Sequence, residues 1–147
     1  MKILIIDDDA VLSKTFEKVC VEMGNDIVVA GNGSDALDII ESDVNGEIGV
    51  ILLDLNLPDI GGLEICKIIR KKFANLSKYI LLITGEHSDE VHVDCLDAGA
   101  DDFVNKPVNL RILRSRVQAG IRLVSEHRDL MAQKEITEKL YHENEFF

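Results

Sequence analysis

The sequence VILLD, at residues 50–54, decides the fold, because four consecutive apolar residues run directly into a carboxylate. A second stretch, ILIIDDD at residues 3–9, has the same form. Short apolar runs of this kind, bounded by polar residues, are typical of strands that are buried on both faces of a parallel sheet. Two buried strands that each end in carboxylates indicate a site at one edge of that sheet.

Strand and helix patterns alternate on either side of these stretches. We predict strands at residues 2–6, 26–30, 49–53, 79–83 and 102–105. We predict helices at residues 10–23, 34–42, 63–73 and 88–98, and a long final helix from about 109 to 141. Gly24 ends the first helix and Ser34 is expected to cap the second.

Five strands that alternate with helices predict a doubly wound α/β domain, in which helices cover both faces of a parallel sheet. In the flavodoxin-like strand order 2-1-3-4-5, the first and third strands are neighbours and their carboxyl ends form the ligand crevice. This order brings Asp7 and Asp8 together with Asp54. An extended C-terminal helix completes the predicted fold.

Size and composition limit the class of protein. The chain has 147 residues, 46% of them hydrophobic, which is enough for one domain with a conventional core and a short extension. No apolar run approaches the ~20 residues that span a bilayer, and the chain begins on a strand, so we predict a cytoplasmic protein. The formal net charge of −11 argues against nucleic acid or an anionic membrane as a direct partner.

The cysteines and histidines show no spacing typical of a metal or redox site. The cysteines lie far apart in predicted helices and form no C-x-x-C pair, so we predict buried or half-buried free thiols at Cys20, Cys66 and Cys95.

The aspartates at the strand ends favour a magnesium site. Carboxylates that gather in one place repel one another unless a cation holds them, and Mg²⁺ prefers oxygen ligands. Asp8 and Asp54 can supply such oxygens. The Asp54 carboxylate is also a competent nucleophile toward phosphorus, provided that Mg²⁺ and Lys106 neutralise the incoming charge. Thr84, which ends the fourth strand, can donate its hydroxyl to a phosphoryl oxygen.

Each of these residues also has a simple structural explanation. An acidic strand end can cap the next helix, Lys106 can be a surface charge, and Thr84 can belong to a turn. Their joint occurrence at the ends of four strands favours one common site.

Five segments together resemble the receiver domain of bacterial two-component response regulators. They are residues 3–9, the sequence DLNLP at 54–58, Thr84-Gly85, the sequence AGA at 98–100, and Lys106-Pro107. The resemblance extends from residue 1 to about 120, so we expect a receiver domain at 1–120. Residues 121–147 are then a helical linker or the start of an absent output region.

The resemblance implies a function and a metal site. Asp54 is the phosphoacceptor, which takes a phosphoryl group from the phosphohistidine of a histidine kinase in a Mg²⁺-dependent reaction. Asp8 and Asp54 bind Mg²⁺ directly, Asp7 binds it through water, and Asn56 binds it through the backbone carbonyl. Asp9 is instead assigned to the first turn of the first helix, where a negative charge suits the helix dipole.

The resemblance also implies a switch. Lys106 contacts the phosphoryl group, Thr84 provides the switch hydroxyl, and Phe103 is the switch aromatic residue. The Lys106-Pro107 peptide is expected to be cis, a geometry found mainly before proline. Gly61 stands where the family commonly has an acidic or polar residue, a departure that concerns the loop rather than the chemistry.

Two further positions bear on the lifetime of the phosphorylated state. Asn56 and Glu86 are the pair found at the same positions in fast-hydrolysing chemotaxis receivers, which this sequence is similar to there. Such side chains can orient an attacking water, so we expect autodephosphorylation within minutes or less.

The implied partners are a sensor histidine kinase or a phosphotransfer protein. The responding surface is formed by the predicted helix 88–98, the strand 102–105 and the final helix. Its charges change sign along the chain, from Asp94, Asp97, Asp101 and Asp102 to Arg111, Arg114, Arg116 and Arg122. They either pair across a two-fold homodimer or form a solvated surface.

The final helix also has an incomplete heptad pattern. Apolar residues recur every seven positions at Val117, Val124 and Met131, but the alternate positions are unsuited to a core: Gly120, His127 and Lys134. The segment is either a dimerising linker or a solvent-exposed spacer.

Two other functions compete. A haloacid-dehalogenase-like phosphatase also uses an aspartate after a strand, but it needs a second aspartate at the position that Asn56 occupies. A receiver-shaped interaction module that is never phosphorylated is the other alternative, which the fold alone does not exclude.

Overall fold

The predicted fold is confirmed by a computed structural model, which describes residues 1–74 and 77–145. One parallel sheet has the strand order β2-β1-β3-β4-β5. The strands are β1 (Lys2–Ile6), β2 (Asp26–Ala30), β3 (Ile48–Asp54), β4 (Tyr79–Thr84) and β5 (Asp102–Asn105). The helices are α1 (Ala10–Glu22), α2 (Gly33–Ser42), α3 (Gly62–Lys72), α4 (Asp89–Asp97) and α5 (Leu110–Glu145). The elements before α5 begin and end within one residue of their predicted limits.

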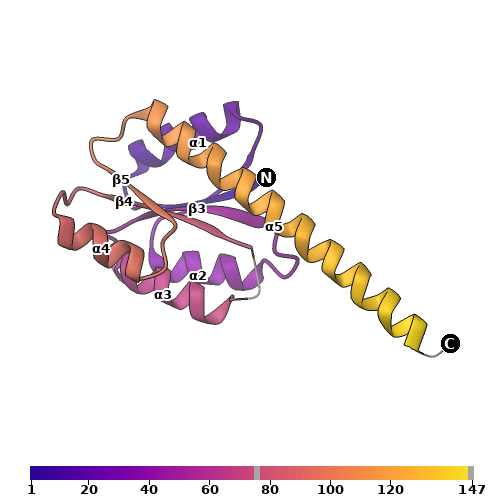
Figure 1. Cartoon of the computed structure of the whole chain (residues 1–147). Helices are drawn as coiled ribbons and strands as arrows, with labels where there is room; N and C mark the ends of the chain where they lie inside the picture. Colours follow the sequence, from indigo (N-terminus) through magenta and orange to yellow (C-terminus); the bar gives the residue numbers. More distant parts are fainter. Residues whose placement is uncertain (75–76, 146–147) are drawn as a thin grey trace.

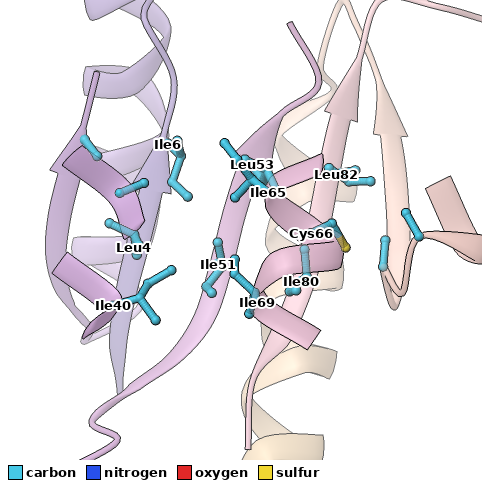
Figure 2. Close-up of a cluster of buried hydrophobic side chains, with 14 of the residues drawn as sticks. Leu4, Ile6, Ile40, Ile51, Leu53, Ile65, Cys66, Ile69, Ile80 and Leu82 are labelled. Atoms are coloured by element: carbon cyan, nitrogen blue, oxygen red, sulfur yellow. The ribbon is translucent and has the colours of Figure 1, made fainter. Parts of the chain in front are cut away.

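Helices cover both faces of the sheet, with α1 and α5 on one side and α2, α3 and α4 on the other (Figure 1). Successive strand side chains point to opposite faces, so each strand feeds two cores. Leu4 and Leu53 belong to the core under α2, α3 and α4, which Figure 2 shows, whereas Ile5 and Leu52 belong to the core under α1 and α5. The cysteines are buried free thiols, as expected: Cys20, Cys66 and Cys95.

The caps of the first two helices differ from the predictions. Ser34 does not cap α2, because Asn32 accepts the N–H of Asp35 at 2.8 Å and thereby starts the helix at Gly33. Asp9 is the N-cap of α1 rather than a residue of its first turn. A carboxylate at that position satisfies N–H groups that the helix leaves free, and it faces the positive end of the dipole.

Helix α5 runs well beyond the sheet (Figure 1). Val117 and Val124 are buried against the sheet, whereas Met131 is 46% exposed. The first two residues of the seven-residue repeat therefore belong to the core of the domain, and the third lies in the part of α5 beyond it. Arg128 still donates hydrogen bonds to the carbonyls of Gly46, at 2.7 Å, and Glu47. A division at residue 120 therefore assigns the last contacts of α5 with the domain to the linker.

Gly120 has a role that its poor helix propensity conceals. A Cβ atom at this position would lie 2.5 Å from Cδ1 of the buried Tyr79 ring. The glycine therefore lets α5 approach β4 closely.

A buried ion pair joins the end of α2 to the start of β4. Lys78 Nζ lies 3.4 Å from Asp43 Oδ2, and the two side chains are only 1% and 6% exposed. Lys78 Nζ also donates to the Ile48 carbonyl at 2.7 Å. Burial alone raises the pKa of Asp43, but the N–H groups of Ile48 and Glu47, together with Lys78, lower it below the ordinary value.

Asp43→Asn is expected to reduce the free energy of unfolding at pH 7 by about 3 kcal/mol, because the Lys78 ammonium is left buried without its carboxylate. A lowered folded-state pKa stabilises the protein above the unfolded pKa and loses that effect as the pH falls. The difference between the two proteins should therefore shrink below about pH 4. Urea unfolding at several pH values measures it.

The matched control is Glu41→Gln, which breaks the exposed pair of Glu41 and Lys72. Its cost should stay below about 1 kcal/mol, because solvent screens exposed charges. Equal costs for the two variants would contradict this account of the buried pair.

Candidate functional site

Three carboxylates meet at the carboxyl ends of β1 and β3. The two strands are neighbours, with Ile6 paired to Leu53, so the residues that follow them lie side by side. Carboxylate oxygens of Asp7, Asp8 and Asp54 all lie within 4.8 Å of one another. Asp7 and Asp54 are each 3% exposed, whereas Asp8 is open to solvent.

Asp7 carries a buried oxygen that has no protein partner. Its Oδ1 accepts the N–H of Asp9 at 2.9 Å, but among the described residues Asp7 Oδ2 is the only buried side-chain polar atom without a hydrogen bond. Burial raises the pKa of Asp7 to about 6; the Asp9 N–H opposes this shift and the charge of Asp54 adds to it. A buried carboxylate oxygen without a donor, beside two more carboxylates, fits a hard cation such as Mg²⁺.

Lys106, which directly follows β5, approaches the carboxylate of Asp54. Its Nζ lies 3.3 Å from Asp54 Oδ1, and its side chain is 32% exposed. The N–H of Lys106 donates to the Thr84 carbonyl at 2.7 Å, which ties this residue to the end of β4. The Lys106-Pro107 peptide is cis, as predicted. The ammonium thus neutralises part of the negative charge at Asp54.

Thr84 and the two expected lifetime residues surround this centre. Thr84 is fully buried at the end of β4, and its Oγ1 accepts the N–H of Glu86 at 2.9 Å. The side chain of Glu86 is exposed. Asn56, in the loop after β3, donates its N–H to Asp54 Oδ1 at 3.3 Å. Asp54 and Thr84 thus end β3 and β4, and the other residues of the centre lie in the loops that follow the strands at this end of the sheet: Asp7, Asp8, Asn56, Glu86 and Lys106.

Phe103 lies on β5 and is half-buried against the core of α2, α3 and α4. Its ring stacks on that of His92 in α4, with ring centroids 4.0 Å apart. Nε2 of His92 lies 3.1 Å from Asn105 Oδ1. Sequence reasoning missed this contact, because nothing in the spacing of His92 pointed to an aromatic partner.

Asp59, in the loop between β3 and α3, was not among the residues expected from the sequence. Its carboxylate accepts the N–H groups of Gly33 and Ser34, at 2.8 and 2.9 Å. These donors hold the pKa of Asp59 below its usual value. The contact joins residues that are far apart in the sequence, so no local pattern could have revealed it.

The charged surface of α4, β5 and α5 is partly paired within the chain. Asp102 lies 3.2 Å from Arg116, and Asp101 lies 2.6 Å from Arg70. Two of the four aspartates that were considered for a dimer contact therefore already have partners. Within the part of the chain that the structure describes, no helix is long and apolar enough to cross a membrane.

Comparison with known proteins agrees with this architecture. Residues 3–118 match the family model of the response regulator receiver domain. A two-component response regulator from Clostridium difficile is 33% identical, with a TM-score of 0.75, and the match covers 83% of this chain and 96% of that one.

Two other solved structures are similar. A CheY-like receiver domain protein from Methanospirillum hungatei JF-1 is 28% identical, with a TM-score of 0.76 and coverage of 86% of this chain and 97% of that one. The BeF3-activated receiver domain of DrrB, a Thermotoga maritima protein, is 31% identical, with a TM-score of 0.73 and coverage of 82% and 97%.

Proposed function

The chain belongs to the response regulator receiver family of two-component signalling modules, and on this premise we propose that Asp54 accepts a phosphoryl group from a phosphohistidine. The donor is a sensor histidine kinase or a phosphotransfer protein. The observation that carries the proposal is the setting of Asp54. Its buried carboxylate lies beside two other carboxylates and 3.3 Å from an ammonium group.

The transfer is a displacement at phosphorus. A carboxylate oxygen of Asp54 bonds to phosphorus while the bond from phosphorus to the imidazole nitrogen breaks, and the electron pair of that bond stays on the imidazole. Lys106 stabilises negative charge on the phosphoryl oxygens, because its Nζ already contacts Asp54. The product is an acyl phosphate on Asp54.

Asp8, Asp54 and the backbone carbonyl of Asn56 are the groups we propose to hold Mg²⁺, with Asp7 acting through water. When bound, the ion neutralises charge on the transferring phosphoryl group and orients it. The buried Asp7 Oδ2, which has no donor in the described part of the chain, supports this assignment.

The response is a population shift that begins at Thr84. Its hydroxyl gives up the N–H of Glu86 and turns toward the phosphoryl group, and Phe103 moves with it. The surface of α4, β5 and α5 then changes its affinity for a partner or an output domain, or for a second copy of the chain. We propose residues 1–120 as the receiver and 121–147 as a helical linker or the start of an output region.

Asp54→Ala is expected to abolish phosphorylation by acetyl phosphate in the presence of Mg²⁺. Intact mass spectrometry should show wild-type protein gaining the mass of one phosphoryl group, and EDTA should prevent the gain, because charge neutralisation is then lost. Asp38→Ala, which removes an exposed aspartate of α2, is the control and should react like the wild type. Equal labelling of the Asp54→Ala protein would refute the proposal.

Glu86→Ala is expected to lengthen the lifetime of phosphorylated Asp54 by about tenfold, because the side chains of Glu86 and Asn56 position the attacking water. The wild-type phosphoryl group should be lost within minutes or less. The decay of the phosphorylated mass after removal of the donor measures both lifetimes. The control Glu90→Ala removes an exposed glutamate from the first turn of α4. A wild-type half-life of many hours would count against this role.

A further inference from the structure

Asp59 fastens the loop between β3 and α3 to the start of α2. Its Oδ1 accepts the N–H of Gly33 at 2.8 Å and the N–H of Ile60 at the same distance. Its Oδ2 accepts the N–H of Ser34 at 2.9 Å. Hydrogen bonds to a carboxylate are stronger than those between neutral groups, and the N-terminus of a helix favours a negative charge. One side chain therefore joins two segments about 25 residues apart in the sequence.

The first residues of α2 and α3 pack closely against the two ends of this loop. A Cβ atom on Gly33 would lie 2.7 Å from Ile65 Cδ1 and 3.0 Å from Ile60 Cβ. At the other end of the loop, the N–H of Gly62 donates to the Leu55 carbonyl at 2.8 Å. A Cβ atom on Gly62 would lie 2.5 Å from the backbone oxygen of Asp54. The loop is thus closed onto the end of β3 and pinned to α2.

Asn32 caps only one of the free N–H groups at the start of α2. Asn32 Oδ1 already accepts the N–H of Asp35, and Asn32 Nδ2 lies 3.0 Å from the Asp35 carboxylate. The Asp59 carboxylate accepts the N–H groups of Gly33 and Ser34, which Asn32 leaves free, and the same contacts hold the loop to which Asp59 belongs.

We propose that Asp59 is a positioning residue for the divalent cation, because it fixes the loop that carries the Asn56 carbonyl. This inference rests on the proposed function. Asn56 lies three residues before Asp59 and two after Asp54, in the loop that Asp59 pins. A backbone ligand has no side-chain rotamer to adjust, so its place is set by the conformation of the loop. Mutation of a residue that orients a metal ligand typically lowers metal affinity by about 10- to 100-fold.

The test is a Mg²⁺ titration of the wild-type and variant proteins, in which binding is measured by calorimetry and by the shifts of backbone amide NMR signals. Asp59→Ala should bind Mg²⁺ about tenfold more weakly than the wild type. Asp59→Asn keeps one acceptor oxygen and should give an intermediate loss. Amide hydrogen exchange at residues 33, 34 and 56 should rise in both variants, whereas the rates of the β-strands should stay unchanged.

The control Asp38→Asn removes a negative charge from an exposed residue of α2. It separates the effect of a lost charge on Mg²⁺ binding from the effect of a displaced loop. This control should bind Mg²⁺ within about twofold of the wild type, because a distant exposed charge is screened. In about 0.5 M KCl, the loss of Mg²⁺ affinity caused by Asp59→Ala should persist.

The proposal fails if Asp59→Ala and Asp59→Asn bind Mg²⁺ as tightly as the wild type, or if their loss disappears at high salt. In both of those cases the wild type still binds, so the proposed function stands. A wild-type protein that does not bind Mg²⁺ at all refutes the metal site and the role of Asp59 together.

Discussion

Lys106→Ala is expected to slow the phosphorylation of Asp54 by acetyl phosphate about 10²- to 10³-fold, the usual cost of removing one donor that stabilises developing oxyanion charge. The ammonium is 3.3 Å from Asp54 Oδ1 and belongs to a residue whose N–H is bonded to the Thr84 carbonyl. Lys106 follows β5 and is hydrogen-bonded to the end of β4, so its ammonium group is already in place before the phosphodonor arrives. The initial rate of mass gain at fixed Mg²⁺ measures the effect.

Mg²⁺ affinity should not fall in the Lys106→Ala protein. Removing a positive charge beside three carboxylates favours a cation, so binding should stay equal or become tighter. Lys67→Ala, which removes an exposed lysine of α3, is the control and should phosphorylate at the wild-type rate. An unchanged rate in the Lys106→Ala protein, or a rate loss explained by weaker Mg²⁺ binding, would contradict the role given to this residue.

In EDTA, the free energy of unfolding of the wild type, relative to Asp7→Asn, is expected to fall by about 2.4 kcal/mol as the pH rises from about 4 to 7. Burial first, and then the neighbouring charge of Asp54, raise the pKa of Asp7 from 3.8 to about 6 in the folded protein, against the opposing N–H of Asp9. A raised carboxyl pKa stabilises the fold below the unfolded pKa. That stabilisation is lost as the pH rises through about 6.

Mg²⁺ should reverse this loss at pH 7, because an ion that binds the folded state alone stabilises it by mass action. Urea unfolding at each pH, with EDTA and with Mg²⁺, measures the two effects. Asp38→Asn should keep the pH profile of the wild type. A difference between the wild type and Asp7→Asn that does not vary with pH would contradict the raised pKa of Asp7.

The sequence predicted the sheet and the position of its site because both depend on local patterns. An apolar run such as residues 50–53 has to be buried, and the residue that ends it must then lie at the edge of the sheet. The flavodoxin-like strand order then places Asp7 beside Asp54, and β1 and β3 are neighbours as expected.

Features that depend on contacts between distant residues were wrong or missed. Ser34 was assigned as a cap from its residue type, but Asn32 starts the helix, and the N–H of Ser34 instead meets Asp59 from another loop. Val117 and Val124 recur at coiled-coil spacing but pack on their own sheet, because the inner face of any helix shows a similar period.

Contacts between side chains of different helices and strands were not predicted either. The pairing of Lys78 with Asp43 and the stacking of His92 on Phe103 join residues whose types allow many other partners. Only the assembled fold selects one of them.

A crystal structure of the wild-type protein grown with Mg²⁺ and beryllofluoride tests the central proposal most directly. We predict beryllofluoride on the Asp54 carboxylate, Mg²⁺ held by Asp8, Asp54 and the Asn56 carbonyl, and Lys106 in contact with a fluorine. An empty pocket under these conditions, with the carboxylate oxygens of Asp7, Asp8 and Asp54 turned apart, would contradict it.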